Sequence, residues 1–377
     1  MTTRCDIFCT IIDNFGDIGV CWRLSRQLAA EHGLDVSLWV DDLATFARLA
    51  PALNPALATQ RLDDITVRHW ADPVEAPDPG DLVIEGFGCR LPSSFLQAMR
   101  ARATPPVWIN LEYLSAEAWV EDCHGLASVH PATGLTQHFW FPGFTERTGG
   151  LLRETGLLAA RNHLQADATA QAAFWTRIGV PEALACAQRV SLFAYENPAI
   201  PGLLTALADA GSPWLILVPE GRALGNVQDW VGRSLHAGER VQRGALTVVV
   251  LPLLATDDYD RLLAGCSLNA VRGEDSLVRA HWAGAPLLWH IYPQEEDAHW
   301  VKLSAWITRV EAATAMPALW AEAQRAWNRG DASPALWRAL VADLPALSGP
   351  ARAWSDRLAA QPDLAAKLMH FWRGQVE

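Results

Sequence analysis

Short runs rich in apolar residues alternate with longer amphipathic segments over the first 145 residues or so. An apolar run of this length predicts a strand buried in a parallel sheet, and a 3.6-residue apolar period predicts a helix. The expected strands are 5–12, 36–40, 65–70, 82–85 and 107–111, with helices over 20–32 and 92–102. Strands and helices at this spacing form βαβ units, so the pattern predicts a parallel sheet covered by helices on both faces.

A second alternation of the same kind begins near residue 190. Its expected strands are 190–193, 214–218, 246–251, 266–271 and 286–290, with helices over 199–210 and 257–265, and sequence from about 310 onward is helical. We therefore predict an α/β protein with domains at 1–155 and 189–348, a helical linker at 156–188, and a C-terminal helix within 349–377 that crosses back to the first domain. Two Rossmann-like domains facing a cleft resemble the GT-B glycosyltransferase fold.

The segment 269–299, NAVRGEDSLVRAHWAGAPLLWHIYPQEEDAH, predicts a ligand site. It is expected to form a strand, a glycine turn at Gly273, a helix from near Asp275, a strand and another helix, with the turn at the carboxyl edge of the sheet. Free N–H groups at the helix start favour a diphosphate, and the Arg272 guanidinium and the Ser276 hydroxyl would add to them.

Helix capping alone could explain Asp275 or Ser276, but it does not explain Glu274 beside them. A carboxylate repels a bound diphosphate, so Glu274 fits better as a group that faces a cation.

The first strand is followed by Gly16-Asp17-Ile18-Gly19, at the usual place of a glycine-rich ligand loop. The spacing is not GxGxxG, so a dinucleotide site is weakly supported. Asp13 and Asp17 are four residues apart and could both face the cleft, although Asp17 could instead cap a helix that starts at Ile18.

Three further features have weaker signals. Tyr195, at the end of the first strand of the second domain, could donate to a phosphate or a sugar, or could be a buried tyrosine with a backbone partner. The backbone of Leu251-Pro252-Leu253 could contact a planar base. His290, His299 and Glu295 could be read as metal ligands, but Glu295 and His299 at i, i+4 fit an ordinary helical pair.

Composition excludes several classes of protein. The chain has 377 residues and a net charge of −12, which argues against a nucleic-acid-binding surface. Of 30 basic residues only Lys302 and Lys367 are lysines, and no P-loop motif occurs. The seven cysteines lack zinc-site spacing, and no apolar run is long enough to span a membrane. We predict a cytoplasmic protein that binds neither nucleic acid nor membrane.

Seven segments, taken together and in order, resemble the bacterial protein-arginine rhamnosyltransferases of the EarP family, which modify translation elongation factor P. They are DNFGDIGVCWRL (13–24), INLEYLSAE (109–117), FPGF (141–144), SLFAYENP (191–198), DYDRLL (258–263), VRGEDS (271–276) and HIYPQEEDAH (290–299). The resemblance implies a GT-B fold, the donor dTDP-β-L-rhamnose, an arginine of elongation factor P as acceptor, and inversion at the anomeric carbon.

Carried over by position, the resemblance implies specific roles. Asp17 and Glu274 would be the catalytic carboxylates, with Asp13 assisting. The donor contacts would be Asn14, Phe15, Gly16, Tyr195, Leu251, Pro252, Leu253, Arg272, Gly273, Asp275 and Ser276. The family has an aromatic residue near Leu251 or Leu253 that stacks on thymine, where this chain has LPLL. No metal and no cofactor are expected.

The chemistry is consistent with these residues. A guanidinium is a poor nucleophile because its lone pairs are delocalised, and a carboxylate can hold it through charge-assisted hydrogen bonds. Asp17 is the expected general base and Glu274 the residue that orients the guanidinium or supports the donor, and the two roles could be exchanged. Two alternatives stay open: a GT-B enzyme with another nucleotide sugar or acceptor, and a nucleotide-sugar sensor without catalysis.

Overall fold

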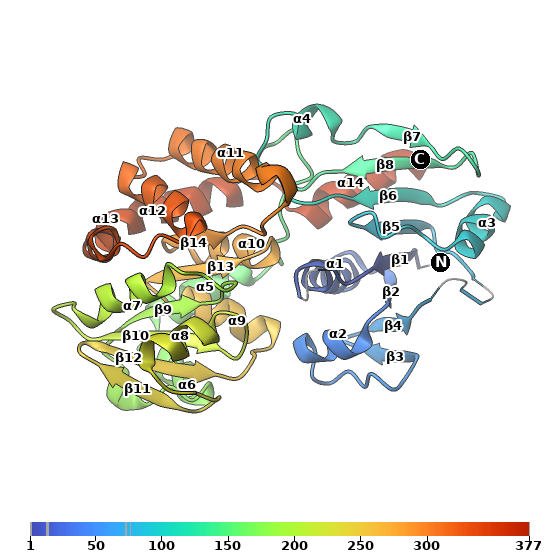
Figure 1. Ribbon diagram of the computed structural model, residues 1–377. Coiled ribbons are helices and arrows are strands. Elements are labelled where there is room, and N and C mark those ends of the chain that lie inside the picture. The colour runs from blue at the N-terminus through green and yellow to red at the C-terminus, as the bar shows by residue number, and fades with distance from the viewer. Residues whose placement is uncertain (1, 13–14, 72–73, 76, 377) are drawn as a thin grey trace. The chain divides into compact units, whose positions relative to one another are not determined.

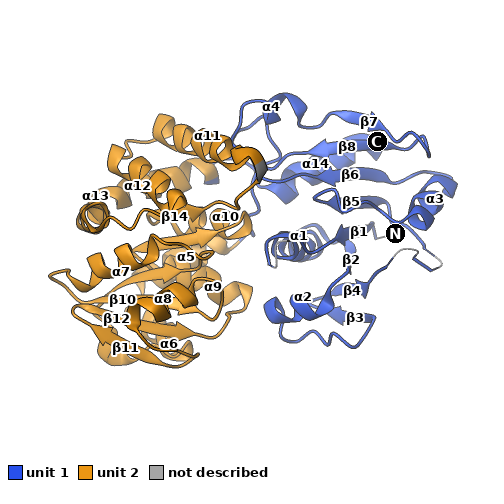
Figure 2. Cartoon of the chain, viewed as in Figure 1, with its two compact units in different colours: residues 1–155, 359–377 blue, residues 156–358 orange. Residues whose placement is uncertain are grey.

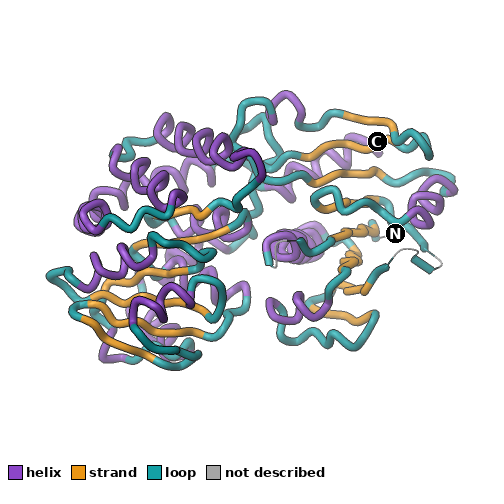
Figure 3. The backbone as a smooth tube through the Cα atoms, in the orientation of Figure 1, coloured by secondary structure: helices purple, strands orange, loops and turns teal. Residues whose placement is uncertain are grey.

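The computed structural model describes residues 2–12, 15–71, 74–75 and 77–376, and it divides into two compact units (Figures 1 and 2). Unit 1 consists of Met1–Thr155 and Ala359–Glu377, and unit 2 of Gly156–Leu358. Each unit is built on its own mainly parallel sheet with helices packed against it (Figure 3). The predicted α/β class and the two parallel sheets are therefore confirmed.

The sheet of unit 1 has the strand order β3-β4-β2-β1-β5-β6-β8-β7. Its strands are β1 (Arg4–Cys9), β2 (Asp35–Val40), β3 (Thr59–Leu62), β4 (Ile65–His69), β5 (Leu82–Gly86), β6 (Val107–Leu111), β7 (Ala127–Val129) and β8 (Thr136–Trp140). The inner strands are parallel, and the edge strands β3 and β7 pair antiparallel with β4 and β8. These two edge strands are missing from the prediction because they are short and mostly polar or exposed, so they carry no apolar run.

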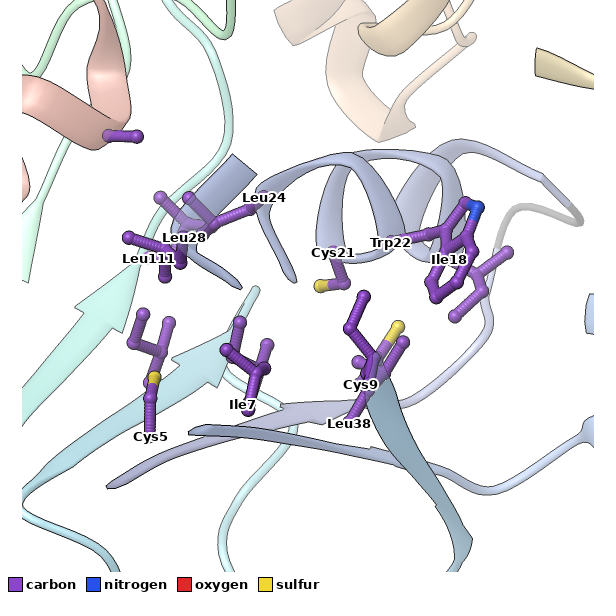
Figure 4. Packing of buried hydrophobic residues seen from close by; sticks show 14 of the residues in the cluster. Cys5, Ile7, Cys9, Ile18, Cys21, Trp22, Leu24, Leu28, Leu38 and Leu111 are labelled. Carbon is purple, nitrogen blue, oxygen red and sulfur yellow. The ribbon is translucent and has the colours of Figure 1, made fainter. Parts of the chain in front are cut away.

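Both faces of this sheet are covered by packed helices. Neighbouring residues of a strand point to opposite sides of the sheet, so successive residues of β1 pack in different clusters. Unit 1 contains α1 (Gly16–His32), α2 (Leu43–Leu49), α3 (Ser93–Ala101), α4 (Val120–Cys123) and α14 (Leu364–Val376). Ile7 of β1 belongs to one apolar cluster with Leu24 of α1 and with residues of α14. Figure 4 shows part of this cluster, including Ile7 and Leu24. Phe8, the next residue, packs on the other face against Phe95 of α3.

The C-terminal segment returns to unit 1 through α14. Its apolar face, which includes Leu364 and Leu368, lies in the core of unit 1, so this helix is part of that core. The prediction placed the returning helix at 349–377, whereas residues 349–358 continue α13 (Pro334–Ala359) in unit 2. Helix α13 runs on through Pro345 and Pro350 because its buried face continues past both of them.

The sheet of unit 2 has the order β11-β12-β10-β9-β13-β14. Its strands are β9 (Gln188–Leu192), β10 (Trp214–Pro219), β11 (Arg240–Arg243), β12 (Leu246–Leu251), β13 (Leu268–Arg272) and β14 (Leu287–His290), of which β11 is an antiparallel edge strand. Its helices, besides α13, are α5 (Leu157–Ala166), α6 (Ala168–Arg177), η1 (Glu182–Leu184), α7 (Ile200–Ala208), α8 (Leu224–Val231), α9 (Thr256–Ala264), α10 (Asp275–Ala283), η2 (Glu295–Asp297), α11 (Ala298–Ala313) and α12 (Ala318–Arg329).

The segment predicted as a linker, 156–188, lies in unit 2 and packs against its sheet. Leu164 of α5 and Trp175 of α6 belong to one apolar cluster with Leu217 of β10 and Leu262 of α9. The segment is therefore a structural layer of unit 2.

None of the helices in the described part of the chain is both long enough and apolar enough to pass through a lipid bilayer.

A buried histidine makes the stability of unit 2 depend on pH. His281 of α10 lies in the core, where Trp306 Nε1 donates to its Nε2 at 3.1 Å, and burial lowers its pKa to about 3. This is below the unfolded value of about 6.5, so unfolding takes up a proton when the pH lies between the two values. The stabilisation is complete above the unfolded pKa and is lost as the pH falls toward the folded one.

We therefore expect His281→Gln to flatten the pH dependence of the free energy of unfolding between pH 6 and 4 by up to about 1.4 kcal/mol per pH unit. Calorimetric unfolding of both proteins across this range measures the difference. Parallel curves for the variant and the parent chain would contradict the assignment.

Candidate active site

One group of candidate residues lies in unit 1, at the carboxyl ends of β1 and β5. Strand β1 lies between β2 and β5, so the chain leaves β1 toward one side of the sheet and later returns on the other side. Such a reversal opens a crevice at the carboxyl ends of the two strands, and this is the usual ligand position in an open α/β sheet. The loop after β1 and the start of α1 lie at this point.

Asp17 is fixed in the first turn of α1. Its carboxylate is 3% exposed, and Oδ2 accepts the N–H of Ile12 at 2.9 Å, so it ties the loop after β1 to the helix. The alternative interpretation, that Asp17 caps a helix beginning at Ile18, is wrong. Helix α1 begins at Gly16, with Phe15 at the cap position, because the Gly19 N–H already bonds to the Phe15 carbonyl at 2.9 Å.

The neighbours of Asp17 in this loop differ in how they are held. The guanidinium of Arg48, on α2, lies 4.9 Å from the centre of the Phe15 ring, a cation–π contact that fixes one side of the loop. Asp41 Oδ1 accepts the N–H of Ile11 at 3.0 Å, next to the bond made by Asp17. The predicted residues Asp13 and Asn14 lie outside the described residues.

Two aromatic residues stack on each other at the same edge of unit 1; Tyr113 lies in the segment 109–117 that carries the family resemblance, whereas Phe87 was not predicted as a site residue. The rings of Phe87, after β5, and Tyr113, after β6, stack with centroids 4.6 Å apart and planes 21° apart. The positive φ of Phe87, 55°, is uncommon for an aromatic residue. Its flanking glycines, Gly86 and Gly88, directly after a strand were the available signal.

A separate group of candidate residues lies in unit 2, at the corresponding reversal between β9 and β13. Arg272 ends β13 and is 8% exposed. Its guanidinium carbon lies 4.8 Å from the ring centres of both Phe193 and Tyr195, which follow β9. The two rings hold the guanidinium in one position, so Arg272 offers a pre-organised positive charge at the strand ends. Phe193 was not predicted, although its spacing of two from Tyr195 would put both rings on one side of an extended segment.

The aromatic cluster around Tyr195 continues to β14. The ring of Tyr195 lies edge-on to His290 at 5.2 Å and to Tyr292 at 5.8 Å. Burial, and then the charges of Arg272 and His299, lower the pKa of His290 to about 4, so its imidazole is neutral near pH 7. Next to a fixed guanidinium, a neutral ring avoids a second positive charge.

The turn between β13 and α10 has the predicted form. Gly273 has φ +64°, a conformation that side chains other than glycine rarely adopt, and its carbonyl accepts the Trp289 Nε1–H at 2.8 Å. Helix α10 begins at Asp275, and Ser276 in its first turn is 7% exposed. Strand, glycine turn and helix start thus lie in the predicted order, and the anion site at this turn stays a prediction.

Glu274 occupies the cap position of α10 without capping it, since its side chain makes no hydrogen bond to the first turn in the part of the chain described here. Its Oε1 lies 4.0 Å from Nζ of Lys302, on α11. The sequence did not connect Lys302 with Glu274, and the expected contact of this carboxylate with a cationic acceptor stays a prediction.

The segment at Leu251, whose backbone is expected to contact a base, ends a buried strand. Leu251 ends β12, its side chain is 1% exposed in the apolar cluster of unit 2, and its carbonyl accepts the N–H of Glu220 at 3.1 Å. Pro252 is exposed and Leu253 half-buried, so these two present the side chains of the segment at the surface. The core packing of the Leu251 side chain does not involve the predicted backbone contact with a base, which stays a prediction.

One of the candidate metal ligands, His299, has a structural partner. His299 Nδ1 accepts the N–H of Gln294 at 3.2 Å, as part of the start of α11. The described residues contain no cluster of three or more histidine, cysteine, aspartate or glutamate side chains that could hold a metal ion.

The family described as elongation factor P (EF-P) rhamnosyltransferase EarP matches residues 5–373. The chain belongs to this family. Proteins named protein-arginine rhamnosyltransferase from Pseudomonas putida and Pseudomonas aeruginosa are each 51% identical to it, over 100% of both chains for the first and over 97% of this chain and 98% of the relative for the second. The one from Shewanella oneidensis is 39% identical, over 97% of this chain and 96% of the relative. The family predicted from the seven segments is confirmed.

Solved structures agree with the fold. A structure described as the structural basis for EarP-mediated arginine glycosylation of translation elongation factor EF-P is 38% identical, has a TM-score of 0.70, and covers 99% of both chains. Acinetobacter baumannii MurG, with a TM-score of 0.52 over 99% of this chain and 100% of its own, is only 12% identical, so it bears on the fold alone. The predicted GT-B fold of this EarP-family protein is confirmed.

Proposed function

We propose that the protein transfers L-rhamnose from dTDP-β-L-rhamnose to an arginine side chain of translation elongation factor P, with inversion at the anomeric carbon. The relatives named protein-arginine rhamnosyltransferase support this activity. The observation that carries it in the structure is the pairing of opposite charges at one turn: Arg272, whose guanidinium contacts two aromatic rings, is followed two residues later by the Glu274 carboxylate. An anionic donor and a cationic acceptor need these two charges side by side.

The donor diphosphate is assigned to the start of α10. Arg272, the Ser276 hydroxyl and the N–H groups of the first turn, including that of Asp275, would stabilise the negative charge that develops on the departing dTDP. Tyr195 would act by holding Arg272 in place and by its own contact with the donor. This set of donors accounts for leaving-group stabilisation without a metal ion or cofactor, and metal-free transfer is part of the proposal.

The acceptor chemistry is assigned to the two carboxylates. One guanidinium nitrogen attacks the anomeric carbon from the face opposite the diphosphate, the C–N bond forms and the C–O bond to dTDP breaks. Asp17 accepts the proton released from that nitrogen, and Glu274 holds the guanidinium by charge-assisted hydrogen bonds. Inversion of a β-linked donor gives an α-linked rhamnosyl arginine. Asp13 is proposed to assist Asp17, and because the acceptor is a translation factor, the proposed reaction takes place in the cytoplasm.

Incubation of the purified protein with dTDP-β-L-rhamnose and unmodified elongation factor P tests the proposal. We expect the mass of the acceptor to increase by one deoxyhexose, with fragmentation placing the sugar on an arginine and NMR of the product showing an α linkage. Unmodified acceptor, under conditions in which a relative from Pseudomonas modifies the same preparation, would refute the assignment.

A panel of nucleotide sugars, measured by calorimetry, separates this activity from another GT-B activity. The segment LPLL at 251–254, with the Leu251 side chain in the core, is the feature that makes the base specificity worth testing. We expect the thymidine donor to bind more tightly than uridine donors. Preference for a uridine donor would favour a different transferase, and binding without release of dTDP in the presence of the acceptor would favour a sensor.

A further inference from the structure

Lysine is rare in this chain, so the choice of lysine over arginine at each of its two positions calls for a structural reason. Of 30 basic residues, 28 are arginines. Lys367 has an evident one: its Nζ lies within hydrogen-bond distance of three carbonyls, those of Thr145 at 3.4 Å, Glu146 at 3.0 Å and Thr148 at 2.8 Å. A compact ammonium can donate to three converging acceptors, whereas the planar fork of a guanidinium cannot. At position 367 a lysine therefore fits the three carbonyls, and an arginine does not.

Lys302 is the other lysine, and it lies beside the turn that carries the site in unit 2. Its Nζ is 4.0 Å from Oε1 of Glu274, and the two side chains are 22% and 23% exposed. The pair joins the second turn of α11 to the cap position of α10. Because both groups are largely shielded from solvent, their interaction is screened less than that of an exposed ion pair.

Lys302 can offset the repulsion between the Glu274 carboxylate and the donor diphosphate. Under the proposed function, the carboxylate lies next to the position of the donor diphosphate, which repels it. The acceptor guanidinium removes this repulsion, but only once the acceptor is bound. Until then another cation must balance the carboxylate, and Lys302 is a cation within 4.0 Å of it.

We propose that Lys302 is a positioning residue that compensates the charge of Glu274 while the donor is bound, and that yields this carboxylate to the acceptor arginine. The inference rests on the proposed function and adds a residue to it. The ammonium is suited to this role because it approaches one oxygen as a point charge. An arginine at the same position would grip both oxygens with its fork, as the acceptor itself does, and would compete with the acceptor.

Two variants separate these effects. Lys302→Met removes the charge and keeps the length of the side chain, so the dissociation constant of dTDP-β-L-rhamnose measured without acceptor should rise about fivefold. Lys302→Arg keeps the charge, so donor affinity should be retained. Its KM for elongation factor P should rise about tenfold with little change in kcat. The introduced guanidinium would occupy the Glu274 carboxylate in most molecules, so only a fraction of them could bind the acceptor arginine there.

Arg309→Met provides the matched control. Arg309 is half-buried on α11, seven residues after Lys302, so the change removes one positive charge from the same helix. It should leave the donor affinity and both kinetic constants at the values of the parent chain.

A double-mutant cycle shows whether Lys302 acts through Glu274. In a Glu274→Gln background, Lys302→Met should no longer weaken donor binding, because no carboxylate is left to balance. Equal weakening in both backgrounds would put Lys302 directly on the diphosphate and overturn the proposal, as would unchanged donor affinity in Lys302→Met or unchanged KM in Lys302→Arg. If the parent chain itself fails to modify elongation factor P, the proposed function has failed, whereas an active parent with unaffected variants refutes the role of Lys302 alone.

Discussion

Asp17→Asn should lower kcat for rhamnosylation of elongation factor P by about two to four orders of magnitude, the range typical for loss of a general base. The amide has the size of the carboxylate, and its oxygen can still accept the N–H of Ile12, so the loop after β1 should keep its structure. Single-turnover transfer, followed by mass spectrometry, measures the effect. Calorimetric titration with the donor should give an affinity close to that of the parent chain.

Asp41→Asn is the control for this variant. Asp41, in the loop after β2, accepts the N–H of Ile11 at 3.0 Å, and Ile11 precedes the residue that bonds to Asp17, so the substitution makes the same chemical change in an acceptor of the same loop. It should keep nearly full activity. Equal losses in the two variants would mean that Asp17 serves the structure of the loop, and full activity of Asp17→Asn would remove it from the mechanism.

Glu274→Gln should lower kcat/KM for elongation factor P by about a hundredfold or more, as expected when one partner of a shielded charge pair is neutralised. Donor binding should be unchanged or tighter, because the diphosphate no longer faces a carboxylate. This opposite movement of two constants distinguishes a group that holds the cationic acceptor from one that holds the donor. Weaker donor binding with an unchanged KM for the acceptor would contradict the assignment.

Glu274→Asp is the companion variant, since it keeps the charge and shortens the side chain by one methylene group. We expect activity between that of the parent chain and that of Glu274→Gln. An aspartate variant as inactive as the glutamine variant would show that position matters as much as charge, and this outcome is consistent with the positioning role of Lys302.

Predictions that depended on a few neighbouring residues agree with the structure. The left-handed turn at Gly273 and the helix start at Asp275 lie where the sequence placed them, because a glycine after a buried strand and before an amphipathic run is a local signal. Short polar strands at sheet edges were missed, because they form only when a neighbouring strand offers its hydrogen-bonding groups.

Local sequence left alternatives open where a residue had two possible partners. Aspartate is a common helix-capping residue, but the Asp17 carboxylate accepts the N–H of Ile12. Helix α1 begins at Gly16, earlier than its apolar period indicates, so Asp17 lies inside the helix. Leu251 has the position of a ligand residue at a strand end, yet its side chain packs in the core. In both residues the partner of the side chain depends on the path of neighbouring segments, which the local sequence does not specify.

The sequence by itself determined the two α/β units, the glycine turn and the conflict between Glu274 and a bound diphosphate, since these follow from local period, spacing and charge. The tertiary structure alone decided that Phe193 and Tyr195 lie against the Arg272 guanidinium and that Lys302 lies 4.0 Å from Glu274. The physical reason is the strand order β9-β13 and the packing of α11 beside α10, which join residues that are about 30 to 80 positions apart.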